Sequence, residues 1–288
     1  MKILPICFLL LSAAVVTAQS DGKAVMSGGS STTLSASEKE DVGDIHPVSD
    51  KPTILSHLRG TVQARGEFVT NAKLLGNHGS SDYITFPTAE IGYNTPLGHG
   101  FSLDLLARSE SAIYAGHDER SFWGFSGNAF LDWRYRPNAP RLFVGTEPYF
   151  YNSFENEHRL AEAFVLSTGI DDGWVFNQHR TLFTAGYKFS NFYASPGLDD
   201  RDAHRVILGL THQFRPGFYG QLFYQFQYSN YINEHRRDSR NIVGLNFIYQ
   251  FNAHLYGSVG ADFIDNDSNQ RLATYQNFAA HAGLALQF

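Results

Sequence analysis

The chain ends with the stretch Phe278-Ala-Ala-His-Ala-Gly-Leu-Ala-Leu-Gln-Phe288, and this stretch decides the fold. Successive side chains of a β-strand point to opposite faces. As a strand, it has an apolar face made of Phe278, Ala280, Ala282, Leu284, Leu286 and Phe288. Its other face carries small or polar side chains, among them His281 and Gln287. A barrel wall in lipid has this composition, because its outer face contacts hydrocarbon and its inner face contacts water or polar groups.

The same alternation of apolar and polar side chains begins after residue 57 and continues to the end of the chain. It is clearest in residues 101–108, 206–214 and 243–251, and weakest in residues 160–170. No helical period competes with it. Pro87 and Pro148 fall within expected strands, where each removes a ladder hydrogen bond. We therefore expect both prolines near the rim or at bulges.

The connections between the expected strands are of two kinds. Tight ones with Pro, Gly or Asn lie at 96–100, 137–140, 215–217 and 252–254, and a longer turn of the same kind is expected at 171–180. Between them are longer, charged connections at 71–82, 115–120, 153–159, 194–202, 230–240 and 266–271. Transmembrane barrels have short periplasmic turns and longer outer loops. The sequence thus predicts an all-β fold over residues 57–288, an antiparallel up-and-down transmembrane barrel of about 12 strands.

The N-terminal segment has the features of a secretory signal. Lys2 supplies its positive charge, residues 3–16 its apolar run, and Val16-Thr17-Ala18 a cleavage site of small residues. Residues 1–18 are therefore predicted to be a cleaved signal peptide. Residues 19–56 are rich in Ser, Gly and Asp, which predicts a flexible periplasmic leader, with a barrel plug as the alternative. Cys7 is the only cysteine and lies in the signal, so the mature chain has no disulfide and no Cys-based metal site.

The last hairpins resemble those of a known family. The resemblance rests on Tyr228-Ser-Asn-Tyr231, Arg236-Arg-Asp238, Gly244-Leu245, Tyr249-Gln-Phe251, Ser268-Asn269, Tyr275, Gly283-Leu284 and the final Phe288. These look like the closing part of porin-like bacterial outer-membrane β-barrels, some of which accompany exopolysaccharide or surface-lipoprotein export. The resemblance implies contact with outer-membrane lipid and lipopolysaccharide. It also implies recognition by the barrel-assembly machinery, with Phe278, Leu284, Leu286 and Phe288 as the assembly signal. Export barrels often carry a helical-repeat domain before the barrel, and its absence from this sequence counts against an export role.

Charged side chains of both signs fall on the face expected to point inward. They are Arg65, Glu67, Glu90, Asp104, Arg108, Asp132, Arg134, Arg136, Glu147, Lys188, Arg205 and Asp262. A charge facing lipid at mid-depth costs about 2–4 kcal/mol, so these residues belong in the lumen. They either line a selective pore or form a neutralising network that fills a narrow barrel. A barrel of about 12 strands lies between the filled and the open sizes, so both interpretations stand.

Other chemistries have weaker support in the sequence. The formal net charge of −6 disfavours a nucleic-acid partner. Outer-membrane phospholipases carry a His-x-Ser-Asn-Gly type segment, and Ser229-Asn230 and Ser268-Asn269 lack both its His and its Gly. The loop histidines His78, His117, His158 and His235 have no paired ligand spacing, so they are interpreted as solvated residues. No metal, cofactor or enzymatic activity is predicted.

The predicted function is a porin-like narrow channel for small hydrophilic solutes in the outer membrane. The alternative is a non-conducting barrel whose charged outer loops bind a partner or stabilise the envelope. A lipid hydrolase and an export barrel are less favoured.

Overall fold

The computed structural model describes residues 24–26, 45–47, 57–71, 80–136, 139–154, 159–177, 180–195 and 200–288. Two short strands, β1 (Ala24–Met26) and β2 (Ile45–Pro47), pair antiparallel with each other. The predicted signal peptide, and the predicted leader apart from these two strands, lie outside the described residues. Among the described residues, no helix combines the length and the apolar character needed to cross a bilayer.

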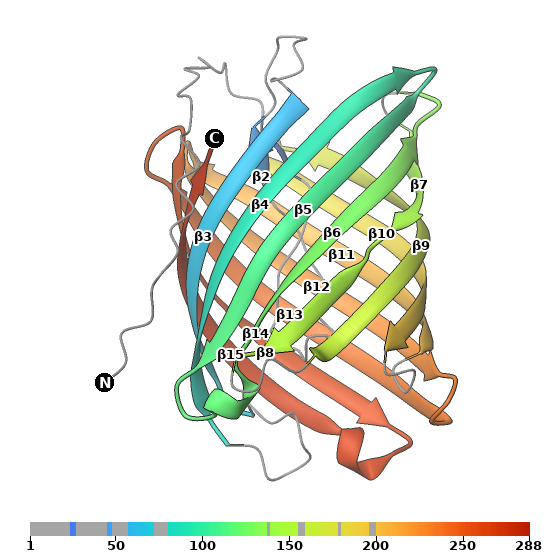
Figure 1. Ribbon diagram of the computed structural model, residues 1–288. Coiled ribbons are helices and arrows are strands. Elements are labelled where there is room, and N and C mark those ends of the chain that lie inside the picture. The colour runs from blue at the N-terminus through green and yellow to red at the C-terminus, as the bar shows by residue number, and fades with distance from the viewer. Residues whose placement is uncertain are drawn as a thin grey trace.

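The other strands form one closed barrel (Figure 1). They are β3 (Leu58–Val69), β4 (Asp82–Gly98), β5 (Phe101–Tyr114), β6 (Phe122–Trp133), β7 (Arg141–Thr146), β8 (Tyr149–Ser153), β9 (Arg159–Phe176), β10 (Thr181–Ser195), β11 (Arg201–Arg215), β12 (Phe218–Tyr231), β13 (Arg236–Gln250), β14 (Leu255–Ser268) and β15 (Tyr275–Gln287). The strands pair antiparallel, and β7 and β8 together occupy one position between β6 and β9. The 13 strands of the sheet therefore make a wall of 12 positions, which confirms the predicted fold class.

The barrel closes where β15 pairs with β3. The register runs from Ala279 opposite Val69 to Gln287 opposite Thr61. The last residue continues the ladder: the Gly60 amide donates to the Phe288 carbonyl at 2.8 Å, and the Phe288 amide donates back at 3.0 Å. The Phe288 ring covers Gly60, so closely that a Cβ on Gly60 would lie 2.4 Å from the ring. The C-terminal aromatic residue is thus part of the seam.

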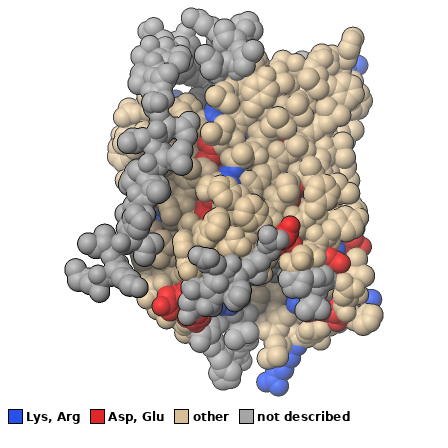
Figure 2. Space-filling model, in the orientation of Figure 1, with Lys and Arg blue, Asp and Glu red and all other residues tan. Residues whose placement is uncertain are grey.

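The two faces of the wall alternate as predicted. On β15, the four residues of the predicted assembly signal, Phe278, Leu284, Leu286 and Phe288, are all exposed on the outer face. Asn277, Ala279 and His281 are buried on the inner face. In Figure 2 a broad area of the outer wall is uncharged, and charged residues gather toward the lower end. The outer surface is therefore apolar where lipid is expected.

The connections alternate between the two ends of the barrel. One end carries the β4–β5, β6–β7, β9–β10, β11–β12 and β13–β14 connections; the other carries the β3–β4, β5–β6, β8–β9, β10–β11, β12–β13 and β14–β15 connections. We call these the turn end, at the top of Figure 1, and the loop end, at the bottom. The loop end carries two single turns of 3-10 helix, η2 (Asp118–Arg120) and η4 (Arg271–Ala273). The turn expected at 171–180 is shorter than predicted, because β9 continues to Phe176.

The two prolines interrupt hydrogen bonding in different ways. Pro148 lies between β7 and β8 and splits one strand position into two, as expected for a proline at an irregularity. Pro87 lies inside β4 opposite Ala64 of β3. Toward β5, the pairing of β4 lapses between Thr85 and Thr88 and resumes in the same register. Pro87 thus weakens one ladder without a register shift.

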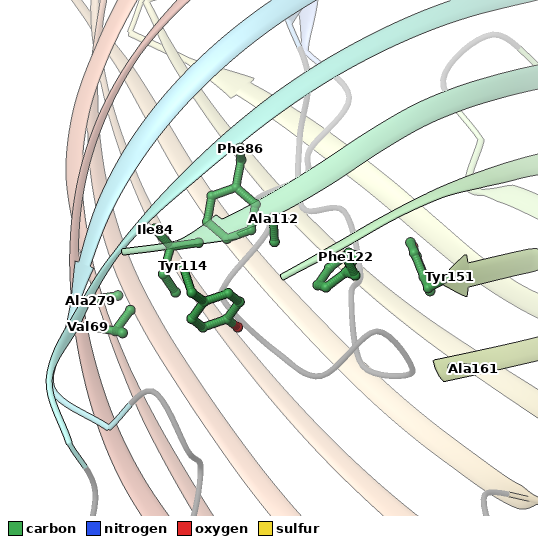
Figure 3. Close-up of a cluster of buried hydrophobic side chains, with 9 residues drawn as sticks. All are labelled: Val69, Ile84, Phe86, Ala112, Tyr114, Phe122, Tyr151, Ala161 and Ala279. Carbon is green, nitrogen blue, oxygen red and sulfur yellow. The ribbon is translucent and has the colours of Figure 1, made fainter. Parts of the chain in front are cut away.

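An apolar cluster fills part of the lumen at the loop end, which the sequence did not predict (Figure 3). It contains Val69, Ile84, Phe86, Ala112, Tyr114, Phe122, Tyr151, Ala161 and Ala279, all on the inner face. A second cluster contains Phe223, Ile242, Ile264 and Tyr275, and a third contains Ala163, Val165, Phe192 and Ala203. Ala161, Ala163 and Val165 of β9 face inward, which explains the weak alternation in residues 160–170.

Single cysteines introduced at two neighbouring positions, one per variant, should show which face of the wall contacts water and which contacts lipid. In a Cys7→Ser background, Ser258→Cys lies on the inner face of β14 and Val259→Cys on its exposed outer face. We expect a water-soluble maleimide to label Ser258→Cys, and a lipid-soluble maleimide to label Val259→Cys in folded protein in bilayers. Labelling of both cysteines by the water-soluble reagent would contradict the transmembrane wall.

The seam should be sensitive to any side chain at Gly60. We expect Gly60→Val to displace the Phe288 ring and to lower the free energy of unfolding by about 1–3 kcal/mol, a typical cost of overpacking. Gly173→Val is the matched control, because a Cβ at Gly173 meets its nearest neighbour, the Leu182 side chain, at 3.3 Å. Urea unfolding followed by the gel mobility of unboiled samples measures both. Equal midpoints for the two variants would show that the contact with Phe288 does not stabilise the seam.

Candidate functional site

Most of the predicted pore-lining residues face the lumen. Arg65, Glu67, Glu90, Asp104, Arg108, Asp132, Glu147, Lys188, Arg205 and Asp262 share the inner face. Arg134 and Arg136 do not: they lie in the exposed connection after β6. The reason is that β6 ends at Trp133, which pairs with Phe101, the first residue of β5. Beyond this pair the Arg134 amide still donates to the Gly100 carbonyl at 2.8 Å, but the chain has left the strand and its side chains are exposed. The apolar–polar alternation of the sequence continues past the end of the strand.

Toward the turn end the inward charges form partly exposed ion pairs. Arg141 of β7 bridges two acids: its Nη2 lies 2.5 Å from Asp171 Oδ2 and its Nη1 lies 3.4 Å from Asp132 Oδ2. The side chains of Arg141 and Asp171 are about one-third exposed, at 33% and 29%. Arg59 Nη2 contacts Asp104 Oδ1 at 3.5 Å. Water therefore reaches this part of the lumen.

At mid-depth and toward the loop end, two of the pairs are more buried. Arg108 Nε lies 2.6 Å from Glu90 Oε1, and both side chains are nearly covered. Arg65 Nη2 lies 3.1 Å from Glu67 Oε2, and Glu67 has no exposed surface. Lys188 Nζ contacts Glu147 Oε1 at 2.5 Å. Each of these charges thus has an opposite partner, and the Arg108–Glu90 and Arg65–Glu67 pairs are less exposed than the Arg141–Asp171 pair toward the turn end.

A group of arginines lies on the inner face of β11 and β13. Arg205 Nε and Arg240 Nη2 both donate to the side-chain oxygen Oε1 of Gln227 on β12, at 3.3 Å and 3.0 Å. The Arg201 guanidinium lies over the Phe192 ring, 4.1 Å from its centroid. Arg201, Arg205 and Arg240 are all buried. We call these three residues the arginine strip.

Acidic residues are concentrated on the other side of the barrel. The inner face of β3 to β5 carries five acids against three arginines: Glu67, Asp82, Glu90, Asp104 and Glu110 against Arg59, Arg65 and Arg108. In the ring of 12 strand positions, β4 and β5 lie six positions from β11 and β12, and so face them across the lumen. The lumen is therefore more acidic on one side and more basic on the other.

Sequence reasoning missed one cluster of polar side chains at the loop end. His117, interpreted above as a solvated loop residue, is only 14% exposed and contacts Asp82 and Ser80. A signal for it existed in the hairpin register. Ile84 pairs with Tyr114, so the next inward positions toward the loops are Asp82 and Gly116, beside His117. Among the described residues, no group of three or more His, Cys, Asp or Glu side chains is arranged to hold a metal ion.

Comparisons with known proteins find the fold and nothing closer. No protein-family model and no curated protein sequence matches the chain. Among solved structures, an outer-membrane channel from Pseudomonas putida F1 superposes with a TM-score of 0.52 at 10% identity, covering 80% of this chain and 95% of the other. The translocator domain of the autotransporter NalP from Neisseria meningitidis gives 0.45 at 11% identity, covering 84% and 91%. The outer-membrane channel DcaP of Acinetobacter baumannii gives 0.42 at 9% identity, covering 80% and 96%.

At these identities the likeness concerns the fold alone. The closed antiparallel wall, its apolar outer face and this likeness agree with one another. The chain has the fold of the bacterial outer-membrane β-barrels.

Proposed function

We propose that the protein is a narrow channel for small hydrophilic solutes in the outer membrane of a Gram-negative envelope. The observation that carries the proposal is the charged lumen. It has water-exposed ion pairs toward the turn end, and its acidic and basic sides face each other across the lumen. Charges inside a barrel cost less than charges against lipid, and they select solutes by field and size.

The lumen has features that suit a pore that selects solutes better than a barrel whose side chains only fill it. The partly exposed pairs of Arg141 with Asp132 and Asp171 keep a polar, hydrated surface toward the turn end. Farther in, the arginine strip faces the acidic side of β4 and β5. Such a transverse arrangement exposes a passing solute to a field of fixed direction, because the charges cannot exchange sides.

The size limit of the channel comes from the loop half. There the apolar clusters and the buried ion pairs leave little surface accessible, and Tyr151 extends from β8 across Gly124 so that its hydroxyl donates to Glu110 of β5. A solute crossing the barrel has to pass this packed layer. The channel therefore suits small solutes rather than polymers.

The same packed layer supports a second candidate, a non-conducting barrel. If the apolar clusters close the lumen permanently, the loops remain as the functional surface, and they bind a partner or stabilise the envelope. Under either function, the proposal includes export through the cleaved signal at residues 1–18. It also includes insertion by the assembly machinery, which reads Phe278, Leu284, Leu286 and Phe288, and contact with lipopolysaccharide at the loop end.

Planar-bilayer recording on the refolded protein separates the two candidates. We expect small, discrete conductance steps, because the turn-end vestibule is hydrated and the packed layer is narrow. The control is Tyr151→Ala, which removes the ring that lies over Gly124 in the packed layer and should raise the unit conductance. A folded protein that stays silent, together with a silent Tyr151→Ala variant, would support the non-conducting barrel instead.

The arginine strip should control ion selectivity. Arg240→Gln removes an inward charge, whereas Arg237→Gln removes an exposed, outward charge on the same strand. We expect Arg240→Gln to lower the anion-to-cation permeability ratio by about fourfold, because one unit charge at roughly 10 Å in water-like surroundings changes the anion and the cation by about twofold each, in opposite directions. Reversal potentials in a salt gradient measure the ratio. Arg237→Gln should leave it unchanged, and identical shifts for both variants would contradict the assignment of the strip to the conduction path.

A further inference from the structure

Ser80, His117 and Asp82 form a continuous chain of hydrogen bonds at the loop end. Ser80 Oγ lies 2.8 Å from His117 Nε2, and His117 Nδ1 lies 2.8 Å from Asp82 Oδ2. The second carboxylate oxygen of Asp82 accepts two backbone N–H groups, from Tyr83 at 2.7 Å and Gly116 at 2.8 Å. These bonds fix the carboxylate, and through it the imidazole ring.

The pattern assigns the protons along this chain. The Asp82 carboxylate can only accept hydrogen bonds, so its partner atom, Nδ1 of His117, must carry the proton. In the neutral ring Nε2 is then an acceptor, and it faces the Ser80 hydroxyl. A hydroxyl that donates to an imidazole, which in turn donates to a buried carboxylate, is the arrangement that activates a serine for acyl transfer.

Burial separates this cluster from ordinary loop residues. The side chains of Asp82 and His117 are 3% and 14% exposed, although both lie at the mouth of the barrel. They come from different elements: Asp82 is the first residue of β4, and His117 lies in the connection after β5. The β4–β5 ladder brings them together, so the position of the base relative to the carboxylate is set by rigid strands.

We propose that Ser80, His117 and Asp82 are an acyl-ester hydrolase site at the outer mouth of the barrel. Ser80 Oγ attacks the ester carbonyl carbon while its proton passes to His117 Nε2. The bond between the carbonyl carbon and the alcohol oxygen breaks, and the alcohol leaves with that proton. Water then attacks the acyl-serine, giving its proton to His117, and the carboxylic acid leaves as Ser80 regains a proton. Asp82 orients His117 and stabilises its charged form in both steps.

The surroundings limit the substrate to short acyl groups on water-soluble molecules. The inner-face residues directly below Asp82 and Gly116 are Ile84 and Tyr114, which pair with each other and are buried with Val69 in the apolar cluster. This packed floor leaves no channel for a long acyl chain. The site faces the aqueous side at the loop end, so the ester must arrive from water. The activity is independent of whether the barrel conducts.

The test uses the folded full barrel, an alkyl fluorophosphonate probe with mass spectrometry, and p-nitrophenyl acetate. We expect the probe to label Ser80, and Ser80→Ala to abolish both labelling and hydrolysis. Asp82→Asn should lower kcat by about 10³-fold or more, in line with the loss of an orienting carboxylate elsewhere. Ser81→Ala is the matched control, because Ser81 is the exposed neighbour, and it should keep full activity.

If these hydrogen bonds only hold the β3–β4 and β5–β6 connections together and support no catalysis, the result will be different. In that case folded wild-type protein is not labelled and hydrolyses p-nitrophenyl acetate no faster than Ser80→Ala, and the proposal is overturned. Gel mobility of unboiled samples shows that each variant is folded. A His117→Gln variant that stays folded but loses labelling supports the assigned base. Faster hydrolysis of p-nitrophenyl palmitate than of the acetate would overturn the short-acyl assignment.

Discussion

The closed hydrogen-bond ladder is the constraint on which the rest of the structure depends. In hydrocarbon no water is available to backbone N–H and C=O groups, so a spanning sheet must have no open edge. Here the last strand pairs with the first wall strand, and the terminal Phe288 exchanges both of its backbone hydrogen bonds with Gly60. Because closure fixes the register of every strand, it also fixes which residues face lipid and which face the lumen.

Closure has a second consequence, since the inner face becomes an enclosed volume. Toward the turn end that volume holds ion pairs that water reaches. Toward the loop end it holds apolar side chains packed on one another, as in the core of a soluble protein. Aromatic rings complete this packing by lying over inward glycines: a Cβ at Gly244, for example, would meet the Phe223 ring at 2.1 Å. The loop half is therefore held by side-chain packing as well as by the ladder, and the turn half mainly by the ladder.

The sequence alone predicted the features that depend on period and on local turn chemistry. Strand alternation gave the fold class, the outward position of Phe278 and Leu284, and the inward position of residues such as Asp132 and Lys188. The prediction failed where the alternation of apolar and polar residues continues beyond the paired residues of a strand. Arg134 continues the alternation but lies past the last pair of β6 and β5. It also failed where apolar residues face inward, because alternation cannot distinguish lipid from an apolar core inside the lumen.

The Ser80–His117–Asp82 cluster was missed for a different physical reason. Its members have no characteristic spacing, and a histidine in a charged connection is usually solvated. What joins them is the register of the β4–β5 hairpin, which becomes known only when the strand ends are fixed. Pairing of Ile84 with Tyr114 forces Asp82 to lie beside Gly116, and the carboxylate then meets both the Gly116 amide and the His117 ring.

The apolar layer also explains how one barrel can hold two separate polar regions. The ion pairs near the turn end and the hydrogen-bonded cluster at the loop end both need a defined geometry, but only the first is in contact with the open part of the lumen. The packed layer between them, which contains Ile84, Tyr114 and Tyr151, covers the inner side of the hydrogen-bonded cluster and supports it from below. A low-dielectric floor strengthens the hydrogen bonds of Asp82 and His117. The same side chains take up part of the lumen, so the narrowing of the lumen and the order of the cluster above it follow from one set of contacts.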